Sequence, residues 1–127
     1  MTLVSEKNLG GMAVDELLAA YVALCLRQFD ANEVEDSRRY NATFPIVMAI
    51  ETELESRAGD QRRVLMGLFD HPNIQVRLQA ARACRSVAPV AAAALLEEIK
   101  ASQRFPQAAD AGMWLRGARR DAAKRKH

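Results

Sequence analysis

Residues 65–87, which read LMGLFDHPNIQVRLQAARACRSV, decide the predicted fold of this chain. Apolar residues recur at the three- and four-residue spacing of a helix on both sides of the Asp70-His71-Pro72-Asn73 turn. Because the residue before a proline is pushed away from helical geometry, a first helix should end at this turn. Asn73 is a typical N-cap for a second helix, which is rich in small residues. The stretch therefore predicts two helices joined by a tight turn.

The rest of the chain also predicts helices. Their approximate ranges are residues 12–29, 32–57, 61–69, 89–99 and 106–120. Asn32 followed by Glu35 resembles a capping box at the start of the second helical region. Pro45 lies inside that region, where it should either kink the helix or break it near Thr43-Phe44.

A weak second copy of the 65–87 pattern follows 32 residues downstream, so that Val76 corresponds to Ala108 and Ala80 to Gly112. Leu115 likewise corresponds to Ala83. The first helix of the pair matches only after a slip of one residue. A degenerate last copy is typical of repeat proteins, because the outer face of a terminal repeat meets solvent.

The 65–87 segment resembles a HEAT-type repeat through its apolar first helix, the Asp70-x-Pro72 turn, Val76-Arg77 and the small residues Ala80, Ala81 and Ala83. More widely, residues 41–99 are similar to an uncharacterised bacterial family of HEAT-like domains of unknown function. The similar segments are TELESR at 52–57, LFDHPNIQVRLQAARA at 68–83 and APVAAAALLEEI at 88–99. The resemblance implies an all-α fold, a short right-handed α-solenoid of six to seven paired helices. It brings no reaction, cofactor or catalytic residue with it.

Length and composition agree with a helical domain. The chain has 127 residues, of which 50% are hydrophobic and only 6% aromatic. We expect a flexible lead-in over residues 1–11, a single helical domain over 12–120 and a basic flexible tail over 121–127. The two cysteines, Cys25 and Cys84, follow helical apolar patterns and are expected to be reduced core residues. No apolar segment is long enough to cross a membrane, so we expect a cytoplasmic protein without a membrane partner.

Charge is unevenly placed along the chain. Residues 1–113 hold 12 Lys and Arg against 15 Asp and Glu, a net charge of −3. From Trp114 onward, six basic residues accompany one acidic residue, Asp121, which gives +5. Such a tail could contact nucleic acid, an acidic protein or anionic lipid, or could simply keep the chain soluble.

Residues with catalytic potential are sparse. His71 lies in the inter-helix turn and His127 ends the chain, and neither has neighbours at zinc-ligand spacing. Glu51, Glu53 and Glu55 alternate on a predicted helix and are expected to be solvated. We therefore expect no catalytic residue, no cofactor and no metal.

The turn residues Asp70, Pro72, Asn73 and Arg77 are expected to be structural. In HEAT-type repeats, the positions of Asp70 and Arg77 commonly build a ladder between neighbouring units. The Asp70 carboxylate should accept hydrogen bonds from the second helix and pair with Arg77. Removing it should then lower thermal stability.

A partner-binding face is predicted on the second helix of the pair. Val76, Ala80 and Ala83 point inward, which leaves Gln75, Gln79, Arg82 and Ser86 on an outward face. In the downstream copy this face becomes Gln107, Ala111 and Trp114. Trp114 is either an anchor for a partner or a lid over its own repeat.

These patterns favour a non-catalytic binding module for another protein, in an adaptor or immunity-type role. The predicted contact residues are Gln75, Gln79, Arg82 and Trp114. The alternative is a nucleic-acid-binding domain that uses the basic C-terminal tail. The oligomeric state stays open at this point.

Overall fold

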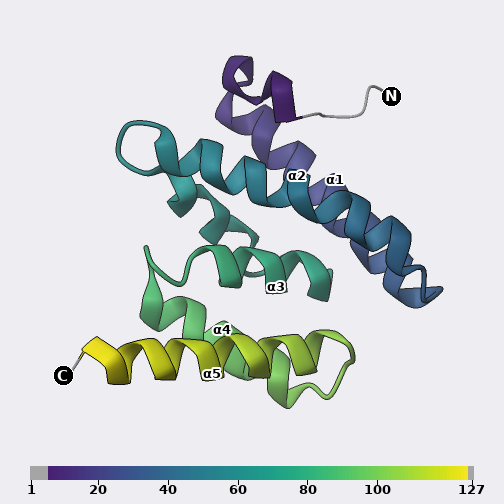
Figure 1. The fold of residues 1–127 in the computed structure, drawn as a ribbon, viewed down its shortest axis with the longest axis vertical. Helices are drawn as coiled ribbons and strands as arrows, with labels where there is room; N and C mark the ends of the chain where they lie inside the picture. Colours follow the sequence, from purple (N-terminus) through teal and green to yellow (C-terminus); the bar gives the residue numbers. More distant parts are fainter. Residues whose placement is uncertain (1–5, 126–127) are drawn as a thin grey trace. The chain divides into compact units, whose positions relative to one another are not determined.

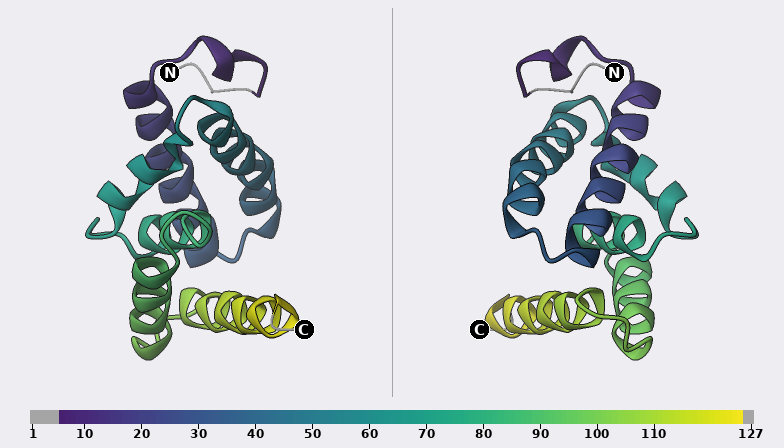
Figure 2. Two further views of the ribbon diagram at one scale, coloured as in Figure 1. Left: turned by 90° about the vertical axis from the view of Figure 1, so that its left-hand side faces the viewer. Right: turned by 90° about the vertical axis from the view of Figure 1, so that its right-hand side faces the viewer.

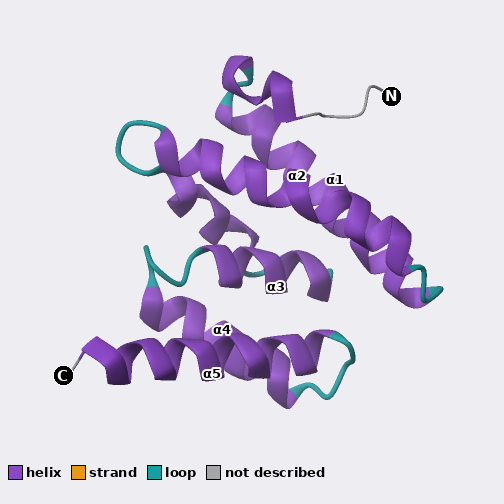
Figure 3. Ribbon diagram, in the orientation of Figure 1, coloured by secondary structure: helices purple, strands orange, loops and turns teal. Residues whose placement is uncertain are grey.

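The computed structural model describes the backbone of residues 6–125 and the side chains of residues 8–117. Two 3-10 helices (η) and five α-helices make up this part of the chain, and Figure 3 shows only helices and loops in it. The elements are η1 Glu6–Gly11, α1 Val14–Glu33, α2 Ser37–Ser56, η2 Gln61–Leu68, α3 Ile74–Ala83, α4 Pro89–Ala101 and α5 Gln107–Arg125 (Figure 1). The predicted all-α class is confirmed.

The chain groups into two compact units, where the sequence had predicted one domain over residues 12–120. Unit 1 is Met1–Val64 and unit 2 is Leu65–His127, so the division falls inside η2. Each unit has its own apolar core, built on helix pairs that are neighbours in sequence.

In unit 1, α1 and α2 form a helical hairpin (Figure 2). Leu17, Tyr21 and Cys25 on α1 are fully buried, as are Val47 and Ile50 on α2. The Tyr21 hydroxyl also donates a hydrogen bond of 2.8 Å to the Glu51 carboxylate across the hairpin. An aromatic side chain with a polar end is thus satisfied inside the core.

The start of α2 differs from the prediction. Helix α1 continues to Glu33, and α2 is capped by Asp36, whose carboxylate accepts a hydrogen bond of 3.1 Å from the Arg39 amide. The predicted capping box at Asn32 and Glu35 is therefore wrong. Glu35 instead takes a left-handed conformation with φ of 55°, which turns the chain between the two helices.

Pro45 does not break α2, because the helix continues on both sides of it. A proline inside a helix costs one backbone hydrogen bond. The burial of Thr43 and Val47 on either side holds both halves of α2 against α1. Pro45 itself is exposed. The predicted break near Thr43-Phe44 is therefore wrong.

Unit 2 contains α3, α4 and α5. Asn73 caps α3 as predicted, since its side-chain oxygen accepts from the Gln75 amide at 2.8 Å and the Val76 amide at 3.3 Å. Pro89 begins α4 as predicted. Helix α3 ends at Ala83, four residues before the predicted end at Val87. Helices α4 and α5 pack together and cross each other (Figure 2).

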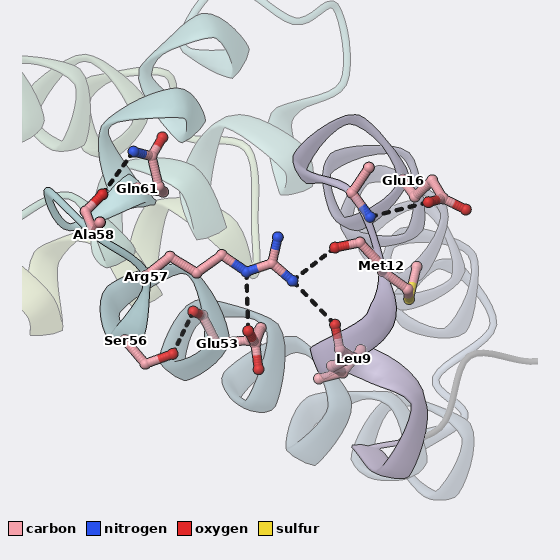
Figure 4. Close-up of polar contacts among 9 residues, drawn as sticks. Leu9, Met12, Glu16, Glu53, Ser56, Arg57, Ala58 and Gln61 are labelled. Carbon is pink, nitrogen blue, oxygen red and sulfur yellow. Dashed lines mark hydrogen bonds and ion pairs between the residues drawn. The ribbon is translucent and has the colours of Figure 1, made fainter.

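Residues 6–11, which the sequence assigned to a flexible lead-in, form η1, and Leu9 is buried. Arg57, at the end of α2, holds this segment (Figure 4). Its Nη2 donates to the carbonyl oxygens of Leu9 at 3.2 Å and Met12 at 2.6 Å. Its Nε bonds the Glu53 carboxylate at 2.9 Å, which fixes the guanidinium. Residues 1–5 lie outside the described part of the chain.

We predict that Arg57→Ala releases η1 without unfolding the hairpin. The loss of charge-assisted hydrogen bonds at a partly exposed site should cost about 1 kcal/mol. Hydrogen exchange should speed up at the Met12 amide, which bonds the Leu9 carbonyl. The exposed Arg63 supplies the control Arg63→Ala, and equal exchange in the two variants would contradict the assignment.

Candidate functional site

Helix α3 carries most of the face that the sequence predicted to be exposed, and this helix is almost entirely buried. Nine of its ten residues are buried, Arg77 being the exception. Gln75, Gln79 and Arg82 retain at most 5% of their exposure. The predicted exposure of these three side chains is therefore wrong. The physical reason is that α3 packs against both α4 and α5, so its polar face does not reach solvent.

These buried polar groups bond to one another and to α5. Gln107 Nε2 donates to Gln75 Oε1 at 3.0 Å, and both side chains are buried. Arg82 Nε donates to Gln79 Oε1 at 2.9 Å. Because a buried polar group without a hydrogen bond is costly, these contacts are a condition of packing α3 where it lies.

Trp114 joins the same cluster through its ring. The guanidinium carbon of Arg85 lies 4.5 Å from the ring centroid, and that of Arg82 lies 5.7 Å away. Both distances fall within the range of cation–π attraction. Trp114 is half-buried, and Arg85 Nε also donates to the Arg82 carbonyl at 2.9 Å. This arrangement favours the lid interpretation of Trp114 over the anchor.

Both contacts between α3 and α5 join residues that are 32 positions apart, Gln75 with Gln107 and Arg82 with Trp114. This is the offset at which the sequence predicted a second copy of the helix pair. Residue numbers rise along both helices from one contact to the other, so α3 and α5 run in the same direction (Figure 1). Equivalent helices of successive repeats pack in this way in a solenoid.

The predicted pairing of Asp70 with Arg77 is wrong. Arg77 Nη1 instead donates to the carbonyl oxygens of His71 at 2.8 Å and Pro72 at 3.3 Å. Asp70 is exposed, and no hydrogen bond or ion pair among the described residues joins it to Arg77. Arg77 therefore binds the backbone carbonyl groups of His71 and Pro72, which are closer to the start of α3, and not the Asp70 carboxylate. Arg77, Pro72 and Asn73 thus shape the turn without Asp70.

The three glutamates of α2 at positions 51, 53 and 55 each bind a different partner. Glu51 is buried and bonds Tyr21, whereas Glu53 pairs with Arg57 and Glu55 with Arg62 at 2.8 Å. The solvated environment predicted for Glu51 is therefore wrong. Within the described part of the chain, no three His, Cys, Asp or Glu side chains are grouped so that they could hold a metal ion.

Asp110 and His71 are two further side chains of unit 2 that could donate or accept a proton. Burial raises the pKa of the half-buried Asp110 carboxyl above its ordinary value. His71 Nδ1 accepts a hydrogen bond of 3.0 Å from the Asn73 amide, which occupies this ring nitrogen in the turn. An acid–base site needs such groups to converge, and these two are engaged singly.

An exposed surface that the sequence reading missed lies on α4 and α5. We call it the Met113 patch and define it by Lys100, Ala109, Met113 and Arg116, all of which are exposed. Met113 is 48% exposed, and Arg116 follows it by one helical turn. The sequence did indicate this patch, because Met113 is an apolar residue on the polar side of the amphipathic helix α5.

The chain shares its fold with proteins already known. The model of a domain of unknown function, DUF2019, matches residues 15–118. The chain belongs to the DUF2019 family. It is similar to the crystal structure of the protein RPA1889 from Rhodopseudomonas palustris CGA009, with 45% sequence identity and a TM-score of 0.82 over 84% of this chain and 88% of that chain. A search of the curated proteins found no match.

The two units of this DUF2019 chain carry opposite charge. Unit 1 holds 7 Lys and Arg against 11 Asp and Glu, a net charge of −4. Unit 2 holds 11 against 5, a net charge of +6. Helix α5 continues to Arg125, whereas its predicted end was near residues 116–120. The side chains of the predicted basic tail, residues 121–127, lie outside the described residues. None of the helices described in the structure is long and apolar enough to cross a membrane.

We predict that Asn73→Ala destabilises this DUF2019 domain by about 1 kcal/mol, because α3 loses its cap. In contrast, Asp70→Ala should stay within about 0.5 kcal/mol of the wild type, as expected of an exposed side chain. Urea unfolding of both variants measures the difference. A larger loss for Asp70→Ala than for Asn73→Ala would restore the ladder that the sequence predicted.

We also predict that Arg85→Gln weakens the packing of α5 on α3 by about 0.5–1 kcal/mol, the range of a cation–π contact. Trp114 is the sole tryptophan of the chain, so its fluorescence reports this contact directly. The emission should shift in Arg85→Gln and stay unchanged in the control Arg104→Gln, where an exposed arginine is replaced. Identical emission in the two variants would refute the contact.

Proposed function

We propose that this DUF2019 chain is a non-catalytic helical-repeat module that binds another protein at the Met113 patch, in an adaptor-type role. The exposure of Met113, together with the exposed Lys100 and Arg116 side chains that lie over the neighbouring Gly112, carries this proposal. Methionine and arginine are enriched in protein interfaces, and an apolar centre with a charged rim is the usual anatomy of one. The whole patch also lies within the 15–118 family match.

The helical-repeat part of the proposal rests on the contacts between α3 and α5. In this view α3 and α5 are equivalent helices of two successive HEAT-like pairs, and α4 pairs with α5 in the second. The pairing of Gln75 with Gln107, 32 residues apart, supports this division. Such a scaffold is rigid, and rigid helices present binding residues with little loss of entropy.

We further place this module in the cytoplasm. Cys25 and Cys84 are both buried, and neither forms a disulfide. Small proteins of oxidising compartments commonly use their cysteines in disulfides, whereas free buried thiols suit a reducing compartment.

A nucleic-acid-binding role is the second candidate, and the charge of unit 2 favours it. Arg116, Arg120 and Lys124 recur at four-residue steps along α5, whose backbone stays helical to Arg125. A basic helix can follow a phosphate backbone. However, the basic residues from Arg119 onward lie beyond the 15–118 family match. The protein-binding role uses a surface inside that match, and we therefore prefer it.

The proposal predicts that a photo-crosslinking amino acid at position 113 captures a specific protein in the native cell. The same amino acid at Val90 is the matched control, since Val90 is 84% exposed but lies at the start of α4. A protein that crosslinks at position 113 and not at position 90 is the expected result. Adding Lys100→Glu should reduce the yield severalfold through the lost charge at the rim.

Two outcomes would count against the protein-binding role. The first is an identical set of crosslinked proteins at positions 113 and 90. The second is binding of the purified chain to DNA or RNA in a gel-shift titration, with an affinity that falls steeply with salt and disappears without residues 118–127. The second outcome would establish the nucleic-acid alternative instead.

A further inference from the structure

The loop between α1 and α2 presents an apolar residue between two acids. We call it the Val34 tip and define it by Glu33, Val34 and Glu35. All three residues are exposed, and Val34 retains 65% of its exposure. In a docked complex, such an apolar side chain makes the central contact and the charges beside it select the partner.

The tip is held in one shape by its backbone. The Glu35 amide donates to the Asn32 carbonyl at 3.2 Å, and the Asp36 amide donates to the Ala31 carbonyl at 2.8 Å. The left-handed conformation of Glu35 completes the turn. Binding through this loop would therefore cost little conformational entropy.

The Met113 patch has the opposite charge, and its two basic side chains both lie over Gly112. A Cβ atom placed on Gly112 would lie 3.6 Å from Arg116 Nη1 and 3.8 Å from Lys100 Cδ. The two side chains thus meet above a residue that has no side chain of its own. No carboxylate among the described residues forms an ion pair with either of them. An anionic group from outside would relieve their mutual repulsion.

We propose that the Val34 tip of one copy of this chain docks on the Met113 patch of a second copy. Glu33 and Glu35 then face Lys100 and Arg116, while Val34 packs against Met113. This inference goes beyond the proposed function and does not rest on it, because the purified chain alone should associate.

A second copy occupies the patch when no other protein is bound to it, because the chain itself supplies both complementary surfaces. The tip belongs to the unit with a net charge of −4, and the patch belongs to the unit with a net charge of +6. Each surface combines an exposed apolar side chain with two like charges, so the docked pair makes both an apolar contact and charge contacts. Since both surfaces are small compared with a stable interface of about 1,600 Å², the association should be weak and should depend on salt.

Sedimentation velocity over a concentration series tests the proposal. The wild type should associate at about 50 mM salt and much less at about 500 mM salt, because screening weakens the charge contacts. The double variants Lys100→Glu/Arg116→Glu and Glu33→Lys/Glu35→Lys should each lose association by about tenfold or more, since like charges then face each other. Arg27→Glu/Arg63→Glu changes the net charge as the first variant does, at exposed positions elsewhere, and should associate like the wild type.

The decisive measurement is an equimolar mixture of the two double variants. Each variant alone has a tip and a patch of the same charge, whereas the mixture offers both complementary combinations. The mixture should therefore recover the association that each variant lost. A mixture that stays monomeric, a wild type that stays monomeric at low salt, or a control that fails to associate would each overturn the proposal. Circular dichroism confirms that all variants are folded.

Discussion

The burial of α3 is the constraint on which the rest of unit 2 depends. A helix with nine of ten residues buried has no solvent face on which to place its polar side chains. Alanines at positions 80, 81 and 83 let its neighbours approach closely, and every polar group on the helix then needs a partner inside the protein. Gln107 and Trp114 on α5 contact Gln75 and Arg82, and Arg82 in turn donates to Gln79. Gln75, Gln79 and Arg82 of α3 are thereby used in packing and do not reach solvent.

Local signals in the sequence were sufficient for the starts of α3 and α4, although not for the cap of α2. Asn73 and Pro89 begin helices where predicted, because capping and proline geometry depend on only a few neighbouring residues. Other errors concern contacts between residues that are far apart in the sequence. Gln75 and Arg82 were assigned to solvent by residue type, but their partners lie 32 residues away, and Tyr21 finds Glu51 across 30 residues. A pattern within one helix does not reveal how many sides of it are covered.

Competition among nearby hydrogen-bond partners explains other differences between prediction and structure. Asn32 and Asp36 are both good caps, and the choice of Asp36 gives α1 its longer C-terminal end. Arg77 could pair with Asp70, yet two backbone carbonyls of the turn lie within its reach. The sequence shows a contrast of charge between residues 1–113, which are acidic overall, and the residues from Trp114 onward, which are basic. In the structure, the charge changes sign between the two compact units, which divide after Val64, and not at the start of the C-terminal tail.

The polar contacts between α3 and α5 also specify how these helices align. Alanine-rich surfaces are nearly uniform, so a shift of one helix along the other would change their apolar packing little. Gln75 with Gln107 and Arg82 with Trp114 share one offset, and both contacts are made in a single alignment. A shifted alignment would break both and leave buried polar groups without partners. Buried polar residues that select one register are known from coiled coils. Here the same physics favours one alignment of α5 on α3, in which Gln75 meets Gln107 and Arg82 meets Trp114.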